Sequence, residues 1–387
     1  MNPFKIYPSE KKTHVDRISG QKVTKLTHFF GNSSHPYFTD NGWYDNNSRM
    51  LFTSDRYNSR NLHSIHINSG EIHQLTDFPE GDGVKAAFTK DVNKPRNETY
   101  YTFNGCVYAL RLTDLSVKPI YKVPPGFSFG GARPTADGKY VIGGLTEDYS
   151  SKVKSNLDAA HNMHEIFNVK PDCRIIRIDL DTNRSEEIWQ ENNWVGHINP
   201  SPTQHNLLTF CHEGPWNLVD HRIWTLDIAD GKTFKLRERK IENEMVGHEY
   251  WLQDGLHIGY QVHRHLPDLS MESFFGFVKY DNTGEFEAPC IAMPSPDHIF
   301  SNGFDFVVSD SGKHIKGYKF NGKSFDGPRI ICMHDGCFDC GSHHPHPRLT
   351  SDGKKIIFNS NVSGYCNIYM VDVPEDFESL PLVCNKQ

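Results

Sequence analysis

Short hydrophobic runs alternate with polar turns along most of the chain. Runs of Val, Ile, Phe, Tyr and Trp are separated by turns rich in Asp, Gly, Asn and Ser, most clearly where TSDGKKIIFNSN precedes CNIYMVDV in residues 344–373. Short runs of this kind, bounded by such turns, predict β-strands. The pattern therefore indicates an all-β protein. The one stretch that predicts a helix is LDAAHNMHEIF, within an insertion at about 145–172.

The strand pattern repeats along the chain. Each repeat passes from an aromatic residue or His through Thr/Ser-Asp-Gly to a run ending near Phe, then to a second run ending in Asp. Repeats of roughly 35–55 residues with three or four short strands are typical of a β-propeller. We find seven repeats, of which the sixth is the least regular: 35–76, 86–121, 131–189, 197–236, 248–289, 298–333 and 344–373.

The last repeat lacks a fourth strand, and the N-terminus carries a candidate for it. The sequence QKVTKLT at residues 21–27 resembles EIHQLT at 71–76, which forms the fourth strand of the first repeat. We therefore expect residues 20–27 to complete the last blade of a seven-bladed β-propeller, which would also hide the edges of its sheets. This interpretation makes residues 1–387 one domain. The helical insertion would rise over one face, and the mixed-charge run 237–244 would be a solvated link between blades.

Composition excludes several classes of function. The formal net charge of -7 over 387 residues argues against nucleic acid as a general partner. No apolar run is long enough to span a membrane, and the first residues lack the apolar core of a signal peptide. Nine scattered cysteines favour reduced thiols and hence a cytoplasmic location. The pair Cys337 and Cys340 is a weakly supported candidate for a structural zinc site.

Two histidines near the C-terminus have the spacing of metal ligands. His344 and His346 each precede a proline, which favours an extended backbone. Residues two apart in an extended chain point to the same side, about 7 Å apart along the chain. Two imidazoles on one face are a common way to bind one metal ion. The alternative is a polar loop that happens to be rich in His and Pro.

The repeats predict that several histidines meet at one place. His35, His248 and His346 each lie seven residues before a turn glycine, so they occupy the same place at the start of the first strand of their repeats. That strand lines the central channel of a propeller. His197 and His298 begin their repeats in a similar way. We therefore expect these histidines to face one pocket at the mouth of the channel.

A long polar turn in the fourth repeat is expected near the same pocket. Its sequence is CHEGPWNLVDHRIW, residues 211–224, and it contains Arg222. An arginine guanidinium can form two parallel hydrogen bonds with the carboxylate of a substrate. The alternative is an ion pair with a neighbour such as Asp220. Trp216 and Trp251 offer flat surfaces to a sugar ring, with packing inside a blade as the alternative for either one.

With these motifs the chain resembles the oligogalacturonate lyases, which are cytoplasmic bacterial enzymes of pectin breakdown that fold as seven-bladed propellers. The resemblance runs nearly end to end. Its most specific parts are CHEGPWNLVDHRIW (211–224), GHEYWLQDG (247–255), HIFSN (298–302) and HPHP with the following DG-KKIIF-S (344–360). The resemblance implies that His248 is the catalytic base and that Arg222 assists catalysis. It also implies a manganese ion, held by His298, His344 and His346.

Three further histidines belong to the expected site, and one metal-ligand position differs from the family's pattern. We expect His35, His197 and His212 to contact the substrate. The family's fourth metal ligand is a Gln three residues before the first His of HPHP, where this chain has Gly341. A glycine has no side chain with which to bind a metal. Water, His343 or Cys340 would then fill the fourth position, or the metal would bind weakly or not at all.

The expected chemistry is β-elimination on a short uronic-acid oligosaccharide, giving an unsaturated uronate. A neutral His can take a weakly acidic proton near pH 7, and a cation stabilises charge on the adjacent carboxylate. Hydrolysis would instead require paired carboxylates at the scissile bond, and none is apparent. Three alternatives stay open: a TolB-like propeller that only binds a partner, a metal-dependent hydrolase or isomerase, and a related lyase acting on a different uronide.

Overall fold

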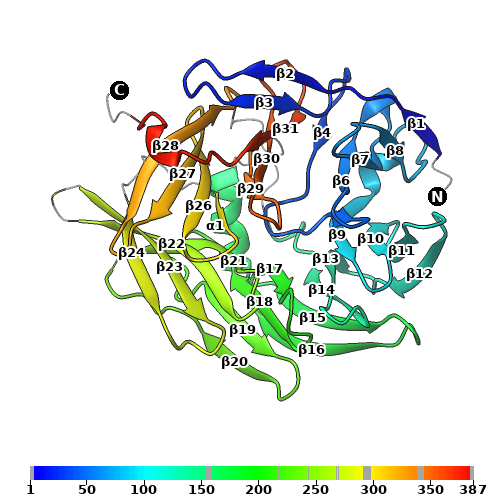
Figure 1. Ribbon diagram of the computed structural model, residues 1–387. Helices are drawn as coiled ribbons and strands as arrows, with labels where there is room; N and C mark the ends of the chain where they lie inside the picture. Colours follow the sequence, from blue (N-terminus) through cyan, green and yellow to red (C-terminus); the bar gives the residue numbers. More distant parts are fainter. Residues whose placement is uncertain are drawn as a thin grey trace. The chain divides into compact units, whose positions relative to one another are not determined.

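The computed structural model describes residues 4–153, 159–216, 218–242, 244–266, 268, 270–290, 298–337 and 344–383. Within these residues the strands form seven sheets in chain order, the blades of a seven-bladed β-propeller (Figure 1). Contacts divide the chain into two compact units. The first contains Met1–Lys85, Met271–Phe275 and Glu287–Gln387, and the second contains Ala86–Ser270 and Gly276–Phe286. The expected single domain over residues 1–387 stays a prediction.

The first unit holds blades one, six and seven. Blade one has the order β1-β8-β7-β6-β4, with β5 beside β6. Its strands are β1 (Lys5–Tyr7), β4 (Ser33–Ser34), β5 (Trp43–Tyr44), β6 (Arg49–Ser54), β7 (Asn61–His66) and β8 (Ile72–Gln74). Blade six consists of β25 (Ile299–Ser301), β26 (Phe306–Ser311), β27 (His314–Phe320) and β28 (Phe325–Met333). Short 3-10 helices lie at Arg56–Asn58, Gly83–Lys85 and Phe377–Ser379.

Blade seven confirms the predicted role of the N-terminal strand. Its order is β2-β3-β31-β30-β29, and its strands are β2 (Lys12–Val15), β3 (Lys22–Lys25), β29 (Arg348–Leu349), β30 (Lys355–Ser360) and β31 (Asn367–Asp372). Strand β3 pairs antiparallel with β31, with Val23 opposite Val371. Two further pairings differ from the sequence expectation: β2 adds a strand outside β3, and β1 pairs with β8 in blade one.

The second unit holds blades two, three and four and the first strands of blade five. Blade two consists of β9 (Ala87–Asn93), β10 (Glu98–Phe103), β11 (Cys106–Arg111) and β12 (Val117–Lys122). Blade three consists of β13 (Phe127–Pro134), β14 (Tyr140–Glu147), β15 (Asp172–Asp179) and β16 (Ser185–Asn192). Blade four consists of β17 (Val195–Pro200), β18 (Leu207–His212), β19 (Ile223–Asp227) and β20 (Lys232–Lys235). Blade five has β21 (Met245–Trp251), β22 (His257–His265), β23 (Met271–Lys279) and β24 (Phe286–Cys290).

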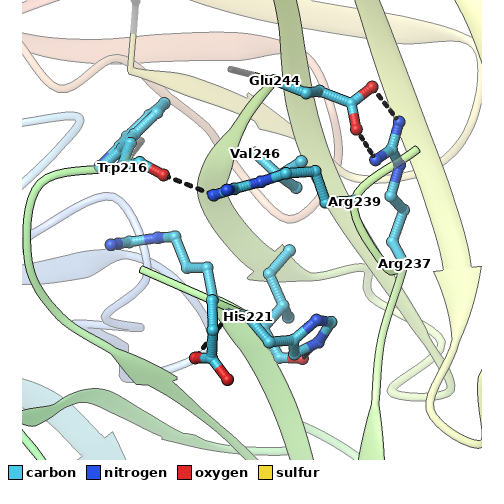
Figure 2. A pocket seen from close by; sticks show the side chains of 9 residues that line it. Trp216, His221, Arg237, Arg239, Glu244 and Val246 are labelled. Carbon is cyan, nitrogen blue, oxygen red and sulfur yellow. Dashed lines mark hydrogen bonds and ion pairs between the residues drawn. The ribbon is translucent and has the colours of Figure 1, made fainter. Parts of the chain in front are cut away.

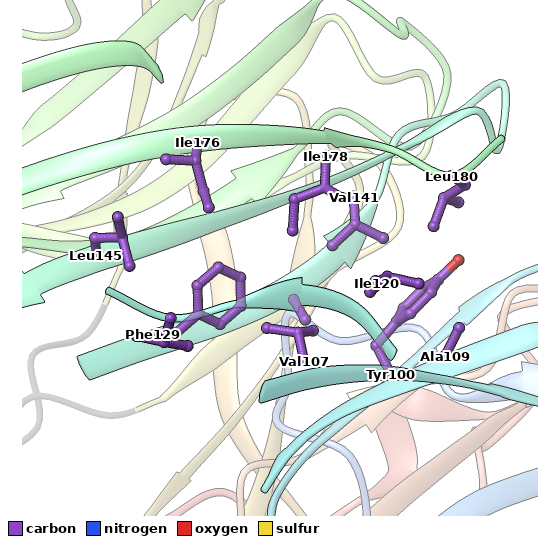
Figure 3. Packing of buried hydrophobic residues seen from close by; sticks show 12 residues of the cluster. Tyr100, Val107, Ala109, Ile120, Phe129, Val141, Leu145, Ile176, Ile178 and Leu180 are labelled. Carbon is purple, nitrogen blue, oxygen red and sulfur yellow. The ribbon is translucent and has the colours of Figure 1, made fainter. Parts of the chain in front are cut away.

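Apolar side chains from neighbouring blades pack together in this unit. Val107 and Tyr100 of blade two share one cluster with Val141, Ile176 and Ile178 of blade three (Figure 3). All five side chains are at most 4% exposed. Burial of apolar surface on both faces of each sheet is the main stabilising term for such a layered fold. This packing explains why the strands read as runs of Val, Ile and aromatic residues.

The repeated turn motif has a local physical cause. Gly138, Gly255 and Gly353 have φ values of 72°, 66° and 69°, in the left-handed region that glycine adopts without steric cost. In the last repeat the carboxylate of Asp352 accepts a hydrogen bond from the Lys354 backbone N–H at 3.1 Å. The Asp-Gly pairs of the repeats are therefore turn residues, as the repeat pattern predicted.

The predicted helix is confirmed as α1 (Ala159–Val169). A Cβ added at Gly214, in the turn after β18, would lie 2.5 Å from the ring of Phe167, so the helix packs closely on that turn. The run 237–244 links blades four and five, and Glu238 and residues 240–242 are exposed, as predicted. The prediction is wrong for the two ends of the run, since Arg237 and Glu244 are 1% and 0% exposed and form a buried ion pair. No helix among the described residues is long and apolar enough to cross a membrane.

Candidate functional site

A cluster of three histidines lies in the first unit, immediately before the innermost strands of blades six and seven. His298 precedes β25, and His344 and His346 precede β29. One ring nitrogen from each lies within 4.8 Å of the others, and all three side chains are partly buried. The ring of His298 lies 4.2 Å from that of His346 and 5.3 Å from that of His344, centroid to centroid. Three imidazoles at this spacing are a donor set suited to one transition-metal ion.

A buried carboxylate organises this cluster. Asp310 of β26 is fully buried and accepts hydrogen bonds from the backbone N–H groups of His298 and His346, each at 2.9 Å. The Nδ1 of His298 also lies 3.2 Å from both Asp310 oxygens. Burial opposes a charge on Asp310, but His298 and these hydrogen bonds outweigh it and lower the pKa of Asp310. A carboxylate on Nδ1 leaves Nε2 of His298 as the nitrogen for a metal.

The backbone at His346 differs from the sequence expectation. Its φ is 45°, so the prediction that both residues before proline are extended is wrong at His346. The reason is local, because the Asp310 carboxylate holds the His346 N–H and the ring is turned toward His298. The pKa of His346 is lowered by burial and by the nearby His298. A neutral imidazole is the form that binds a metal.

His35 supports the same segment from blade one. It is 2% exposed, and its Nε2 lies 3.1 Å from the carbonyl oxygen of Pro345, between the two histidines of the pair. The backbone N–H of Asn359 donates to the same oxygen at 2.9 Å. These contacts hold the His-Pro-His segment in place. The expected contact between His35 and a substrate stays a prediction.

The residues expected near the fourth ligand position lie outside the described part of the chain. These are Cys340, Gly341 and His343. The suggested zinc site at Cys337 and Cys340 cannot be placed for the same reason. Cys337 itself is exposed.

A second polar cluster, in the second unit, is built around Arg222. The Nε of Arg222 donates to Glu249 at 3.1 Å, and its Nη1 donates to Glu213 at 3.2 Å. The neighbouring carboxylates that hold the fork are therefore these two and not Asp220. Among the described residues, Nη2 of Arg222 has no hydrogen-bond partner. Burial opposes the charge on Arg222, but the carboxylates raise its pKa well above the usual value.

His197 joins this cluster through Glu213. Its Nε2 lies 2.8 Å from the second Glu213 oxygen, so one carboxylate bridges His197 and Arg222. Burial opposes a proton on the imidazole, but Glu213 outweighs it and raises the pKa of His197. Glu249 is 2% exposed, and among the described residues its Oε1 has no hydrogen-bond partner.

His248 lies on β21, beside Arg222 and Trp216. Its Nδ1 is 2.5 Å from the side-chain amide nitrogen of Gln261 on β22. The indole of Trp216 meets the His248 ring edge-on at 5.1 Å and lies 5.4 Å from the Arg222 guanidinium carbon. A Cβ at Gly247 would lie 2.7 Å from the same indole, so this glycine permits the close approach of Trp216.

The turn that carries Trp216 and Arg222 is held by a further arginine. Nη2 of Arg239 donates to the carbonyl oxygens of Trp216 and Val219 at 2.9 and 2.7 Å. Figure 2 shows the contact between Arg239 and Trp216 beside the buried pair of Arg237 and Glu244, in a pocket that Arg222 also lines. The mixed-charge run 237–244 therefore stabilises the polar turn through hydrogen bonds from Arg239 to its backbone carbonyl oxygens.

His212 and Trp251 have other partners. His212 is 6% exposed, with Nε2 at 3.0 Å from Glu191 and Nδ1 at 3.0 Å from the Asn193 amide. Its expected contact with a substrate stays a prediction. The indole N–H of Trp251 donates to the carbonyl of Asn199 at 2.8 Å, and the side chain is 9% exposed. This favours the packing interpretation for Trp251, whereas Trp216 lies beside the candidate base.

Three of the predicted site histidines share an unusual backbone conformation. His197, His248 and His346 have φ values of 47°, 52° and 45°. The strand pairing is interrupted by a bulge at His197 and again at His248. In blade three the corresponding bulge contains Gly131, with φ of 71°. β-Bulges re-aim side chains and are common beside active sites.

The comparisons with known proteins agree with one another. The family model described as oligogalacturonate lyase matches residues 4–377. An oligogalacturonide lyase of Pectobacterium atrosepticum is 28% identical, over 94% of this chain and 96% of its own length. An oligogalacturonate lyase of Dickeya dadantii is 27% identical over the same shares.

Solved structures give the same result. A structure of an oligogalacturonate lyase in complex with manganese superposes with a TM-score of 0.84 at 25% identity, covering 98% of this chain and all of the other. The fold also matches an oligogalacturonate lyase of Vibrio parahaemolyticus, with a TM-score of 0.83 at 24% identity and coverage of 97% and 100%. The family match includes the three-histidine cluster and the polar cluster around Arg222. The chain therefore belongs to the oligogalacturonate lyase family.

Proposed function

We propose that this protein cleaves short oligogalacturonides by metal-assisted β-elimination and releases an unsaturated uronate. The observation that carries the proposal is the cluster of His298, His344 and His346, fixed by Asp310. These three histidines are the residues to which the family resemblance assigns the metal. A TolB-like binding module would need neither this donor set nor the buried ion pairs of Arg222.

We propose manganese as the metal, because one of the similar structures is an oligogalacturonate lyase in complex with manganese. The donor set fits a divalent transition metal, because three ring nitrogens lie within 4.8 Å and a buried carboxylate orients one of them. A set of nitrogen ligands also suits Zn, Ni or Fe, so elemental analysis of the purified protein identifies the ion. When bound, the cation supplies positive charge that stabilises the carboxylate of the uronate as negative charge develops beside it.

We propose that His248 is the general base. A neutral imidazole accepts the C5 proton of the uronate, the C4–O4 bond breaks, and a C4=C5 double bond forms. Gln261 and Trp216 hold the His248 ring. For Nε2 to accept the C5 proton, Nδ1 carries the ring hydrogen and donates it to Gln261, which requires the side-chain oxygen of Gln261 to face Nδ1. Arg222 presents Nη2 to the substrate carboxylate, because Nε and Nη1 are held by Glu249 and Glu213. His197 contacts the substrate from the same cluster.

We propose a cytoplasmic location and a short anionic oligosaccharide as the substrate. Cys106, Cys173, Cys211 and Cys332 are thiols that form no disulfide, which is typical of a reducing compartment. The net charge of -7 opposes a long polyanion, but Arg222 and a bound cation provide local positive charge for a short one. A different uronide with the same carboxylate is the second candidate, and the departure at Gly341 from the family's ligand pattern favours testing it.

One assay tests the proposed reaction. Purified protein with manganese is incubated with trigalacturonate, and ultraviolet absorbance is followed together with the yield of reducing ends. A lyase increases both, because each elimination forms a conjugated double bond and one new reducing end. New reducing ends without a rise in absorbance would show that the protein is a hydrolase. No change in either quantity would mean that the protein acts on another uronide or only binds a partner. A chelated sample serves as the control for the metal.

A further inference from the structure

Two histidines of the second unit occupy the same structural position in consecutive blades. His197 on β17 and His248 on β21 each lie at a bulge of the first strand, with φ of 47° and 52°. Their strands are joined by the hydrogen bond from Trp251 to Asn199. Arg222 is the second link, because it reaches from blade four to Glu249, the residue next to His248.

The two imidazoles have different partners. The Nε2 of His197 contacts a carboxylate, Glu213, at 2.8 Å. The Nδ1 of His248 contacts an uncharged amide, Gln261, at 2.5 Å. A carboxylate favours the imidazolium form of its partner, whereas an amide adds no charge that does so. An imidazole that is held in its charged form by a carboxylate can donate a proton, which complements the base role proposed for His248.

Resting on the proposed function above, we propose that protonated His197 is the general acid of the elimination and gives its proton to the departing O4. His248 takes the C5 proton, the electrons of that C–H bond form the C4=C5 double bond, and the C4–O4 pair leaves with oxygen. Because Glu213 holds the Nε2–H of His197, the proton leaves from Nδ1 and converts that oxygen to a hydroxyl. His248 gains one proton and His197 loses one, and exchange with water restores both before the next turnover.

The charges around His197 support this assignment. Glu213 contacts the ring directly, Glu249 adds a second negative charge, and Arg222 is bound to both carboxylates. A protonated His197 therefore completes a neutral group of two cations and two anions. The nearby Cys211 stays a neutral thiol, because burial raises its pKa well above the usual value. The raised pKa of His197 agrees with this count.

A metal ion is the competing explanation for the same residues. His197, Cys211 and Glu213 offer ligand atoms within 4.8 Å of one another. Arg222 already places a cation on the Glu213 carboxylate, at 3.2 Å. A metal ion on Glu213 would displace the bond between His197 and Glu213, and its charge would exceed what the two carboxylates balance beside Arg222. The proton is the cation that this site accommodates. The His197 ring is also 30% exposed, so it can reach a substrate.

The test compares leaving groups. His197→Gln and His248→Ala are assayed on trigalacturonate and on a galacturonide whose O4 carries a para-nitrophenyl group, which departs as a stable anion. His197→Gln is expected to lose roughly 10²–10⁴-fold in kcat on trigalacturonate and to recover most of that loss on the aryl substrate. His248→Ala is expected to stay slow on both, because the base is needed in either case. Equal losses of His197→Gln on the two substrates would overturn the proposal.

A pH profile separates the acid from a merely structural residue. The pKa of His197 is raised, so the active protonated form is present at lower pH and is lost as pH rises through that pKa. Glu213→Gln removes the carboxylate and lowers the pKa of His197, so the alkaline limb of kcat should move to lower pH while the acid limb stays. An unmoved alkaline limb would contradict the proposal. If wild-type protein gives no unsaturated product, the proposed function itself fails, which is a separate outcome.

Discussion

At the scale of single residues, the site combines a strained backbone with buried carboxylates. His197, His248 and His346 have positive φ, a conformation that costs residues other than glycine about 1–3 kcal/mol. Such strain persists because surrounding contacts hold it. At His346 the holding group is Asp310, and at His197 it is Glu213.

Asp310→Asn tests whether this carboxylate orients the metal ligands. The amide keeps the size but loses the charge-assisted bonds to His298 and to the His346 N–H. We expect manganese affinity, measured by titration calorimetry, to fall roughly 10–100-fold, as for other carboxylates behind a metal-binding histidine. The exposed Asp372, paired with Lys355, gives the control Asp372→Asn, which should bind manganese like wild type. Unchanged affinity in Asp310→Asn would exclude an orienting role.

Arg222→Lys tests the arginine fork. A lysine ammonium is one point charge and cannot bond Glu213, Glu249 and a substrate carboxylate in three fixed directions. We expect kcat/KM on trigalacturonate to fall by roughly 10²–10³, the usual effect of losing one positioned donor. Lys240→Arg, at an exposed ion pair with Glu285, should leave kcat/KM unchanged. Near wild-type kcat/KM in Arg222→Lys would mean that only its charge is needed.

The sequence indicated the histidines of the site but not the carboxylates behind them. Glu213 and Glu249 each follow directly after a site histidine, a signal that was available but was not used. Asp310 follows the apolar residues of its run and precedes Ser311 and Gly312. That local sequence resembles a turn, so the hydrophobic pattern gave no sign that Asp310 is buried. The positive φ of His346 was also missed, because a following proline favours extended backbone. Gly131 at the corresponding place in blade three was the one hint of the conformation.

At the scale of elements, blade limits followed from the sequence because the strands of each blade alternate with turn motifs. The predicted limits of blade four, 197–236, differ from the observed Val195–Lys235 by two residues or fewer. Strands β1 and β2 were missed for a physical reason. Every residue of β2 is exposed, and β1 has no buried residue, so neither strand carries a hydrophobic pattern.

Deletion of residues 1–28 tests the contribution of the N-terminal strands. It removes β1, β2 and β3 and leaves the outer edge of β31 in blade seven unpaired, while β30 stays on its inner side. Because an unpaired strand edge promotes aggregation, we expect soluble expression to be lost. Deletion of residues 1–8 removes only β1 and should give soluble protein, since β3 still pairs with β31. Soluble, folded protein lacking residues 1–28 would show that blade seven does not need β3.

At the scale of the whole molecule, metal binding and stability are linked. A ligand that binds only the folded state stabilises it by about 2.7 kcal/mol at a concentration of 100 times Kd. Manganese should therefore raise the Tm of the wild-type protein in a calorimetric scan. The double variant His344→Ala, His346→Ala lacks two of the three ring donors and should show no such rise. Full activity of that variant in metal-free form would remove the metal from the mechanism.

The most direct test of the central claim is the turnover of His248→Ala at saturating trigalacturonate, with bound manganese verified by elemental analysis. Loss of a general base typically reduces the rate by roughly 10²–10⁴. We predict a fall in kcat of that size, with the metal still bound, because His248 is not part of the three-histidine cluster. Near wild-type turnover would contradict the account, and the base would then have to be sought among His35, His197 and His212.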